Sequence, residues 1–272
     1  MRRSKRLFQD LKHGRLEWSG FISMTLMKRF VDKSVIVTGG ASGIGLSTAN
    51  RFAREGARVA IFDCNEEAMG STLAEYPELT GTLVDVRNGA DLEQAFQKAA
   101  ETNGPVDVLV ANAGVSERIN FLDIPADQWR RILDVNLNGV FLACQIAARQ
   151  MMSRNADGII LATSSTNAIA GNPYYADYNA SKAGVLALVR TMARELAPRI
   201  RVNAVCPGYV LTPMQEREYT PEAMRELNQR IPIGRHADPG EIASLFAFLA
   251  SEEGRYLTGA AIIIDGGELL GA

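Results

Sequence analysis

The chain has 272 residues, 47% of them hydrophobic, and a formal net charge of −2, which suit one large domain and give no electrostatic basis for binding nucleic acid. Only two histidines and three widely spaced cysteines are present, which argues against a metal site, a Ser-His-Asp mechanism and a disulfide framework. We therefore expect no metal, and a cytoplasmic location with reduced thiols. We also expect no membrane partner, because no stretch approaches the roughly 20 apolar residues of a membrane helix.

Residues 1–30 differ from the rest of the chain, because they are basic and only weakly periodic. The apolar stretch 20–27 is followed by Lys28 and Arg29 instead of the small residues of a signal-peptide cleavage site. We interpret 1–30 as a flexible extension, or as the product of an upstream start with Met24 or Met27 as the true one. The remaining residues, 31–272, are expected to form a single domain.

A glycine-rich turn follows the first expected strand. Residues 34–38 are apolar and β-rich, the turn reads Gly39-Gly-Ala-Ser-Gly43-Ile-Gly45, and a helical pattern covers 46–55. Strand, glycine turn and helix form the context in which a dinucleotide's pyrophosphate approaches backbone N–H groups at a helix start. The turn residues expected to contact the cofactor are Gly39, Ser42, Gly43, Ile44 and Gly45.

The second expected strand, 58–63, ends in Asp63, which lies 18 residues after Gly45. A carboxylate at this place accepts hydrogen bonds from the adenosine ribose hydroxyls and repels a 2′-phosphate. Its neighbours Ser42 and Cys64 carry no charge. The pattern favours NAD over NADP.

Strands and helices then alternate to the end of the chain. The further expected strands are 82–85, 106–111, 159–162, 201–205 and 260–264. The further expected helices are 90–102, a long one capped by Asp127 and running to 154, 175–196, and one from Asp238 to 250. This alternation predicts an α/β fold, a Rossmann-type doubly wound parallel sheet of about seven strands with helices on both faces.

The stretch 158–182 carries the expected chemistry. Ser165 follows a buried strand, and Tyr178 and Lys182 are four residues apart on one face of the next helix. A nearby ammonium stabilises a phenolate, which lets a tyrosine exchange a proton with an alcohol or carbonyl. Ser165 can donate a hydrogen bond to the same substrate oxygen. Asn136, a polar residue in an apolar stretch, is expected either to be structural or to hold a water near this pair.

The unusual polar residues and glycines of the chain share one position, the carboxyl end of a strand. Gly39, Asp63, Asn112, Ser165 and the pair Pro207-Gly208 all lie at the end of an expected strand. Parallel strands end at one rim of the sheet, where ligands of such folds bind. These residues are therefore expected to form a single site.

Together these residues resemble the classical short-chain dehydrogenase/reductase family over roughly residues 32–267. Residues 38–45 match its T-G-x-x-x-G-x-G motif, and Ser165, Tyr178 and Lys182 match its catalytic serine and Y-x-x-x-K with the usual gap of thirteen residues. Asn136 matches the asparagine that completes the family's tetrad. One departure is Ala111, where the family often has the first asparagine of N-N-A-G.

The resemblance implies hydride transfer between a nicotinamide and a secondary alcohol or ketone. Tyr178 would be the general acid/base, Ser165 would orient the substrate oxygen, Lys182 would lower the tyrosine pKa and hold the nicotinamide ribose, and Asn136 would support a water relay. It also implies a homotetramer or homodimer. The further cofactor contacts that it implies are Asp85, Val86, Asn112, Ala113, Gly114, Pro207, Gly208, Val210 and Thr212.

The substrate is expected to be a polyol, sugar or cyclic diol. The expected lining is Ser116, Asn167, Tyr174, Tyr209 and Met214, which mixes hydroxyl, amide and thioether groups. The irregular stretch 209–235 is expected to act as a lid. A 3-oxoacyl-thioester (acyl carrier protein) reductase is the alternative enzyme, and a non-catalytic NAD-binding sensor is the remote one.

Overall fold

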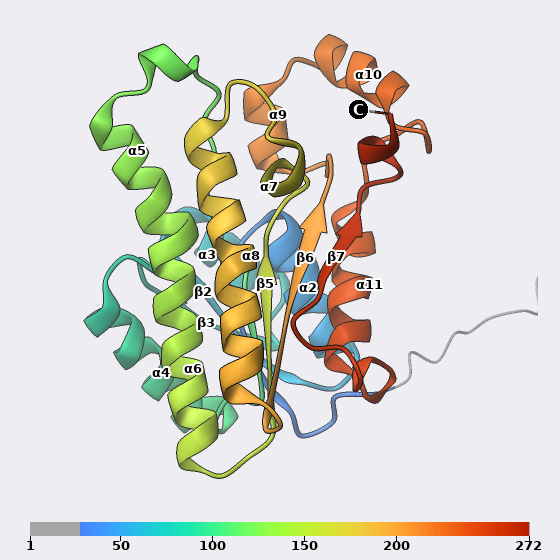
Figure 1. Cartoon of the computed structure of the whole chain (residues 1–272). Helices are drawn as coiled ribbons and strands as arrows, with labels where there is room; N and C mark the ends of the chain where they lie inside the picture. The colour runs from blue at the N-terminus through green and yellow to red at the C-terminus, as the bar shows by residue number, and fades with distance from the viewer. Residues whose placement is uncertain (1–27, 272) are drawn as a thin grey trace, which may run out of the picture.

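The computed structural model describes residues 28–271, and its centre is a seven-stranded parallel sheet in the order β3-β2-β1-β4-β5-β6-β7 (Figure 1). The expectation of a Rossmann-like, doubly wound sheet is confirmed. The strands are β1 (Ser34–Thr38), β2 (Arg58–Asp63), β3 (Leu79–Leu83), β4 (Val108–Ala111), β5 (Gly158–Thr163), β6 (Ile200–Pro207) and β7 (Ala261–Ile264).

The order of the strands reverses between β1 and β4, which are direct neighbours with Val35 opposite Val108. Crossovers lead from β1 toward β3 on one side and from β4 toward β7 on the other. The loops that leave β1 and β4 therefore part in opposite directions, and a cleft opens above their carboxyl ends. The topology alone places the cofactor cleft at this point.

Helices cover both faces of the sheet and enclose a separate core on each (Figure 1). Phe96 of α4 and Met151 of α6 belong to one core, while Phe52 of α2 and Phe246 of α11 belong to the other. The helices are α2 (Gly43–Arg54), α3 (Glu66–Glu75), α4 (Gly89–Asn103), α5 (Ala126–Leu133), α6 (Val140–Ser153), α7 (Asn167–Ala170), α8 (Ala176–Leu196), α9 (Pro213–Glu218), α10 (Pro221–Arg230) and α11 (Pro239–Ala250). The shorter turns are η2 (Phe121–Asp123), η3 (Asp134–Gly139), η4 (Glu252–Gly254) and η5 (Glu268–Leu270).

Three expectations about individual elements need correction. Helix α3 was not expected, and β3 starts three residues earlier than the expected 82–85. Asp127 does not cap the long helix, because Pro125 holds the cap position and Asp127 lies in the first turn. The long helix is also interrupted, since η3 is a π-helical turn between α5 and α6.

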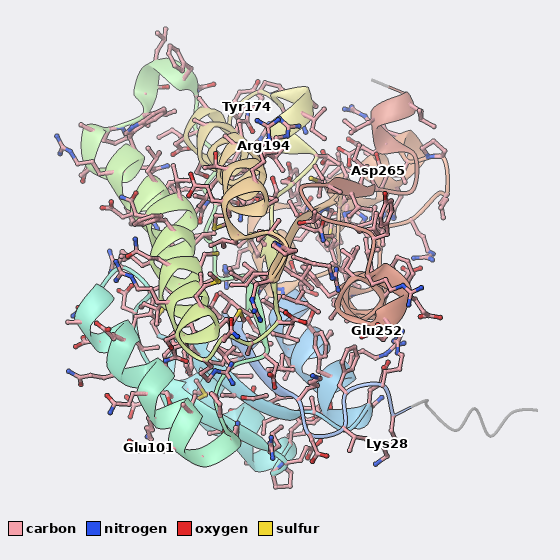
Figure 2. The ribbon with its side chains drawn as sticks, turned by 60° about the horizontal axis from the view of Figure 1, so that its bottom comes forward. Lys28, Glu101, Tyr174, Arg194, Glu252 and Asp265 are labelled. Atoms are coloured by element: carbon pink, nitrogen blue, oxygen red, sulfur yellow. The ribbon has the colours of Figure 1, made fainter. Side chains whose placement is uncertain are left out.

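The packed part of the chain begins two residues before the expected boundary at 31. Phe30 is buried against Phe52, and Arg29 pairs with the buried Glu55 and with Glu253. Figure 2 shows Lys28 and Glu252 at the same end of the molecule. The expectations for residues 1–27 lie outside the described residues. Among the helices of the described residues, none combines the length and apolar character needed to cross a bilayer.

Candidate active site

Ser165, Tyr178 and Lys182 come together where β5 ends beside the first turns of α8. Ser165 lies two residues beyond β5, and its Oγ accepts a hydrogen bond from the N–H of Asn167 at 3.1 Å. The Nζ of Lys182 donates to the carbonyl of Thr163, the last residue of β5, at 2.8 Å. That Nζ lies 5.7 Å from the centroid of the Tyr178 ring. One strand end and one helix face therefore position all three side chains.

Burial controls the protonation of this group. Burial raises the pKa of the Tyr178 phenol to about 12, while its hydrogen bond with Ser165 acts to lower it. Burial also lowers the pKa of the Lys182 ammonium to about 8. The expected lowering of the tyrosine pKa by Lys182 stays a prediction, because the ammonium is directed at the Thr163 carbonyl and burial dominates at the phenol.

Asn136 lies in η3 and is completely buried. Its Oδ1 accepts from the N–H of Val115, and its Nδ2 donates to the carbonyl of Val115, both at 2.8 Å. The same Nδ2 donates to the hydroxyl of Ser181, which lies beside Lys182 in α8. The side chain thus has a structural function, tying the loop after β4 to α8, and its part in a water relay stays a prediction.

A cleft of about 600 Å³ lies at the switch point and contains most of the expected cofactor residues. The expected residues that line it are Gly39, Ser42, Gly43, Ile44, Asp63, Asp85, Val86, Asn112, Ala113, Gly114, Tyr178, Lys182 and Thr212. Four others lie outside its lining: Gly45 is packed behind the turn, Val210 pairs with Ala237, Pro207 ends β6, and Gly208 lines the neighbouring pocket. Lining residues that the sequence did not indicate include Arg87, Thr163 and Arg217.

The glycine turn fits a dinucleotide. A Cβ on Gly45 would collide with the carbonyl oxygen of Gly39, so only glycine lets α2 start this close to β1. Ser42 caps α2 without a side-chain hydrogen bond, and the first turn of the helix holds no acidic residue. Its free N–H groups and the positive end of its dipole suit a pyrophosphate.

Asn112 fixes the loop after β4 against this turn. Its Nδ2 donates to the carbonyls of Thr38 and Gly39, both at 3.2 Å, and its Oδ1 accepts from the hydroxyl of Thr163 at 3.0 Å. The Thr38 hydroxyl in turn accepts from the backbone N–H groups of Asn112 and Ala113. The ends of β1, β4 and β5 are therefore joined by one hydrogen-bond network, which makes the rim rigid.

Asp63 ends β2 and lines the same cleft as Tyr178. Its Oδ2 accepts from the N–H of Ala41 at 3.1 Å and its Oδ1 from the N–H of Asn65 at 3.0 Å. Arg87, a cationic residue of the cleft lining, is bound to Asp85, and this pairing lowers the pKa of the Asp85 carboxyl. Asp63 thus presents a carboxylate where the ribose of a dinucleotide is expected.

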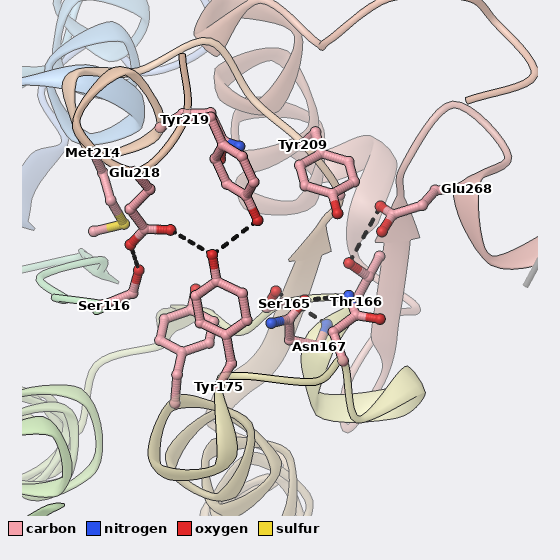
Figure 3. Close-up of a pocket in the computed structure, with 14 residues that line it drawn as sticks. Ser116, Ser165, Thr166, Asn167, Tyr175, Tyr209, Met214, Glu218, Tyr219 and Glu268 are labelled. Atoms are coloured by element: carbon pink, nitrogen blue, oxygen red, sulfur yellow. Dashed lines mark hydrogen bonds between the residues drawn. The ribbon is translucent and has the colours of Figure 1, made fainter. Parts of the chain in front are cut away.

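A smaller pocket of about 80 Å³ adjoins Ser165 and Tyr178 (Figure 3). Of the expected substrate residues, Ser116, Asn167, Tyr209 and Met214 line it. Tyr174 is not among the lining residues. Its ring is exposed, and the Cζ of Arg118 lies over it at 4.3 Å from the ring centroid. The adjacent Tyr175 lines the pocket in its place.

Two carboxylates in this pocket were missed at the sequence level. Glu218, at the end of α9, accepts hydrogen bonds from the hydroxyls of Ser116 and Tyr175 (Figure 3). Glu268, in η5, accepts from the hydroxyl of Thr166 at 3.4 Å. Burial raises the pKa of Glu268 to about 7, and the nearby Asp265 acts in the same direction. No local motif marks either residue, since only the fold brings them to Ser165.

The stretch 209–235 was expected to be irregular, but it contains the helices α9 and α10. Tyr219, which follows α9, places its hydroxyl 2.8 Å from that of Tyr175. The two ends of the stretch 209–235 are held together by a β-bridge between Val210 and Ala237.

No cluster of three or more His, Cys, Asp or Glu side chains suited to a metal ion occurs among residues 28–271.

Comparisons with known proteins agree with this geometry. A model of the family described as "Enoyl-(Acyl carrier protein) reductase" matches residues 39–268. The 3-oxoacyl-[acyl-carrier-protein] reductase FabG of Thermotoga maritima is 40% identical over 245 residues, which cover 88% of this chain and 98% of that protein. The chain belongs to the short-chain dehydrogenase/reductase family.

Other members of the short-chain dehydrogenase/reductase family are nearly as similar. The L-rhamnose 1-dehydrogenase (NAD(P)(+)) of Azotobacter vinelandii is 39% identical over 247 residues, covering 87% of this chain and 96% of that protein. A crystal structure of a short-chain type dehydrogenase/reductase from Mycobacterium marinum has a TM-score of 0.84 at 33% identity, covering 89% and 97% of the two chains. The chain is therefore an oxidoreductase of this family that acts on CH–OH groups, with a nicotinamide cofactor of the NAD(P) type.

Proposed function

We propose that this protein is an NAD-dependent dehydrogenase/reductase that acts on a secondary alcohol or ketone of a polyol, sugar or cyclic diol. The observation that carries the proposal is the position of Tyr178, which lines both the large nucleotide cleft and the small polar pocket. A group shared by the two cavities contacts a substrate and a nicotinamide at once.

The roles of the side chains follow from their contacts. Tyr178 takes the proton of a substrate hydroxyl during oxidation and returns one to the oxygen during reduction. The hydroxyl of Ser165 donates to that oxygen and holds it near the phenol. Lys182, buried below the tyrosine, stabilises the phenolate when it forms. When bound, the nicotinamide accepts or returns the hydride.

Asp63 supports NAD as the cofactor. Its two oxygens are fixed by the N–H groups of Ala41 and Asn65, so the carboxylate cannot swing out of the cleft without losing both hydrogen bonds. A 2′-phosphate near it would meet uncompensated negative charge, because the guanidinium of Arg87 already binds Asp85. A ribose diol instead donates to a carboxylate.

The lining of the small pocket supports a polar substrate. Apart from Met214 and Gly208, every lining residue carries a hydroxyl, amide or carboxylate group. An alkyl chain there would leave these groups without hydrogen-bond partners, which costs free energy. A polyol, sugar or cyclic diol offers a hydroxyl to several of them.

A 3-oxoacyl-thioester reductase is the second candidate, favoured by the 40% identity to an enzyme of that name. The L-rhamnose 1-dehydrogenase is 39% identical, so identity alone does not separate the two substrate classes. The small polar pocket favours the first.

The test follows reduction of NAD+ and NADP+ by absorbance over a panel of polyols, sugars, cis-diols and hydroxyacyl thioesters. We expect turnover with NAD+ on the first three classes and its loss in Tyr178→Phe, which keeps the ring and removes the proton-exchanging hydroxyl. Turnover only on thioesters would establish the second candidate. Tight NADH binding without turnover on any compound would support the sensor.

We also propose a homo-oligomer, a tetramer or dimer, located in the cytoplasm. Exposed apolar side chains on two elements support the assembly: Phe141 and Met152 of α6, and Ile263 of β7. Large apolar groups of this kind are frequent at contacts between subunits. Light scattering of the purified protein measures the state, and a monomer at micromolar concentration would contradict the proposal.

A further inference from the structure

Glu268 lines the small pocket together with Ser165 and Tyr178. It begins η5, directly after the two glycines that follow β7, and its Oε2 accepts from the hydroxyl of Thr166, the residue after Ser165. A Cβ on Gly208 would collide with the same Oε2. The carboxyl group is therefore seated against the end of β6 and next to the catalytic serine (Figure 3).

Most of the hydrogen-bonding capacity of Glu268 is unused. The one hydrogen bond of its carboxyl group within the described residues is the long contact with Thr166, and none of the ion pairs among residues 28–271 includes it. The nearby Asp265 makes no hydrogen bond with Glu268. Its two carboxylate oxygens accept from the N–H groups of Gly267 and Leu269 instead. A half-buried carboxyl group needs donors, and a ligand in the pocket is in a position to supply them.

The opposite wall of the pocket differs. Glu218 already accepts from Ser116 and Tyr175, so its negative charge is offset by two donors from the protein (Figure 3). Between the two carboxyl groups lie hydroxyl and amide side chains, which both donate and accept. A hydroxyl group of a substrate matches such partners in both directions. An ammonium group fits these partners less well, because it can only donate hydrogen bonds. An anionic group would be repelled by the two carboxylates, Glu218 and Glu268.

We infer that Glu268 is a specificity-determining residue, whose carboxylate accepts a hydrogen bond from a second hydroxyl of the substrate, selects neutral polyhydroxylated compounds and excludes anionic ones. The inference rests on the proposed function and narrows its substrate class. It also gives the carboxyl-terminal turn η5 a part in the reaction, in addition to Ser165, Tyr178 and Lys182.

Protonation of Glu268 supplies a readout that a purely structural residue would not give. Burial raises the pKa of Glu268 to about 7, so the group is neutral below that pH and negatively charged above it. Rejection of an anionic substrate should therefore strengthen as the pH rises through 7. The other titratable or charged groups around this part of the pocket are Asp265, Tyr209, Glu218, Tyr219, Tyr175, Tyr178, His236 and Arg230.

The experiment compares kcat/KM with NAD+ for a neutral polyol and for the hydroxy acid of the same chain length, between about pH 6 and pH 8.5. The wild-type preference for the polyol should rise roughly tenfold over this range, as expected for one added charge near the anion. Compared with the wild type, Glu268→Gln should have a higher KM for the polyol. Its preference for the polyol over the hydroxy acid should be lower than that of the wild type at high pH. Lys182, with a pKa lowered by burial to about 8, titrates in both proteins, so the difference between them isolates Glu268.

Glu101→Gln, an exposed acid of α4, is the matched control and should behave as the wild type. Equal pH profiles in the wild type and Glu268→Gln, with the polyol turned over by both, would overturn the inference and leave the proposed function intact. A preference for an amino alcohol over the polyol would also overturn it. Absence of turnover on every alcohol would overturn both.

Discussion

At the residue scale, the proposal that the cofactor is NAD rests on the negative charge of Asp63. The carboxylate is held by two backbone N–H groups, and the residues beside it in the cleft, Cys64 and Ser42, are uncharged. The sequence was sufficient to place Asp63, because a strand end 18 residues after the last turn glycine has a fixed position in this fold. It was not sufficient to show Arg87, whose pairing with Asp85 depends on a loop.

Replacing Asp63 with serine should shift the cofactor preference. The substitution removes the negative charge while keeping a small polar group, so we expect kcat/KM with NADP+ to rise by roughly tenfold and that with NAD+ to fall by a similar factor. Both values come from steady-state kinetics at saturating substrate. Glu66→Gln, a nearby exposed acid in the first turn of α3, is the control and should leave both unchanged. A wild-type enzyme that already prefers NADP+ would contradict this reading of Asp63.

Glu218 and Glu268 show why the substrate pocket resists prediction from sequence. Ser165, Tyr178 and Lys182 have a fixed spacing that indicates their chemistry, whereas the two glutamates lie in segments without any such pattern. They reach the pocket because α9 folds over the loop after β4 and because the chain turns back after β7. Long-range packing of this kind leaves no local signal.

At the element scale, the sequence placed the long helices and buried strands well and the short elements poorly. Helix α3 escaped notice because its ten residues include Gly70 and form only a weakly amphipathic pattern. Pro213 and Pro221 indicated an irregular segment, yet each stands at the first position of a helix, where proline is favoured. Strand β3 is set by its pairing with β2, which ends at Leu83, so the expected run at 82–85 shares only residues 82 and 83 with it.

Tyr175 is one of the residues that attach α9 and the stretch after it to the pocket. The Tyr175 hydroxyl donates to Glu218 at 2.8 Å and lies 2.8 Å from the hydroxyl of Tyr219. Tyr175 comes from the start of α8, so these contacts tie the stretch 209–235 to the helix that carries Tyr178. The function of this stretch as a lid stays a prediction, and these contacts are the ones that such a lid would release on opening.

Tyr175→Phe should loosen this attachment without removing the ring. We expect KM to rise several-fold with a smaller change in kcat, because a less ordered stretch 209–235 leaves the substrate fewer fixed partners while Tyr178 and Ser165 stay in place. Limited proteolysis should also cleave within 209–235 faster than in the wild type. Tyr256→Phe, at a fully exposed tyrosine, is the control. Unchanged KM and unchanged cleavage would show that the hydroxyl of Tyr175 does not hold the lid.

At the scale of the whole molecule, the sheet separates the two cores, and the site lies at the carboxyl ends of its central strands. The β1–β4 switch point fixes where the nucleotide cleft opens, and the end of β5 fixes where Ser165 enters it. The rim network around Asn112 joins the strand ends. The catalytic geometry therefore depends on the packing of both cores, including the one closed by residues 29 and 30.

The segment that enters the domain at Arg29 should therefore contribute to stability, although Arg29 and Phe30 line neither the cleft nor the small pocket. Phe30 is 2% exposed and packs on Phe52 of α2 at a ring distance of 4.7 Å. Phe30→Ala should lower the free energy of unfolding by about 3–5 kcal/mol, the usual cost of removing a buried phenylalanine ring. Thermal unfolding measures this as a fall in Tm of order 10 °C. Phe121→Ala, at a ring that is 73% exposed, should change little. Equal Tm values for the two variants would show that the packed domain begins at residue 31, as the sequence suggested.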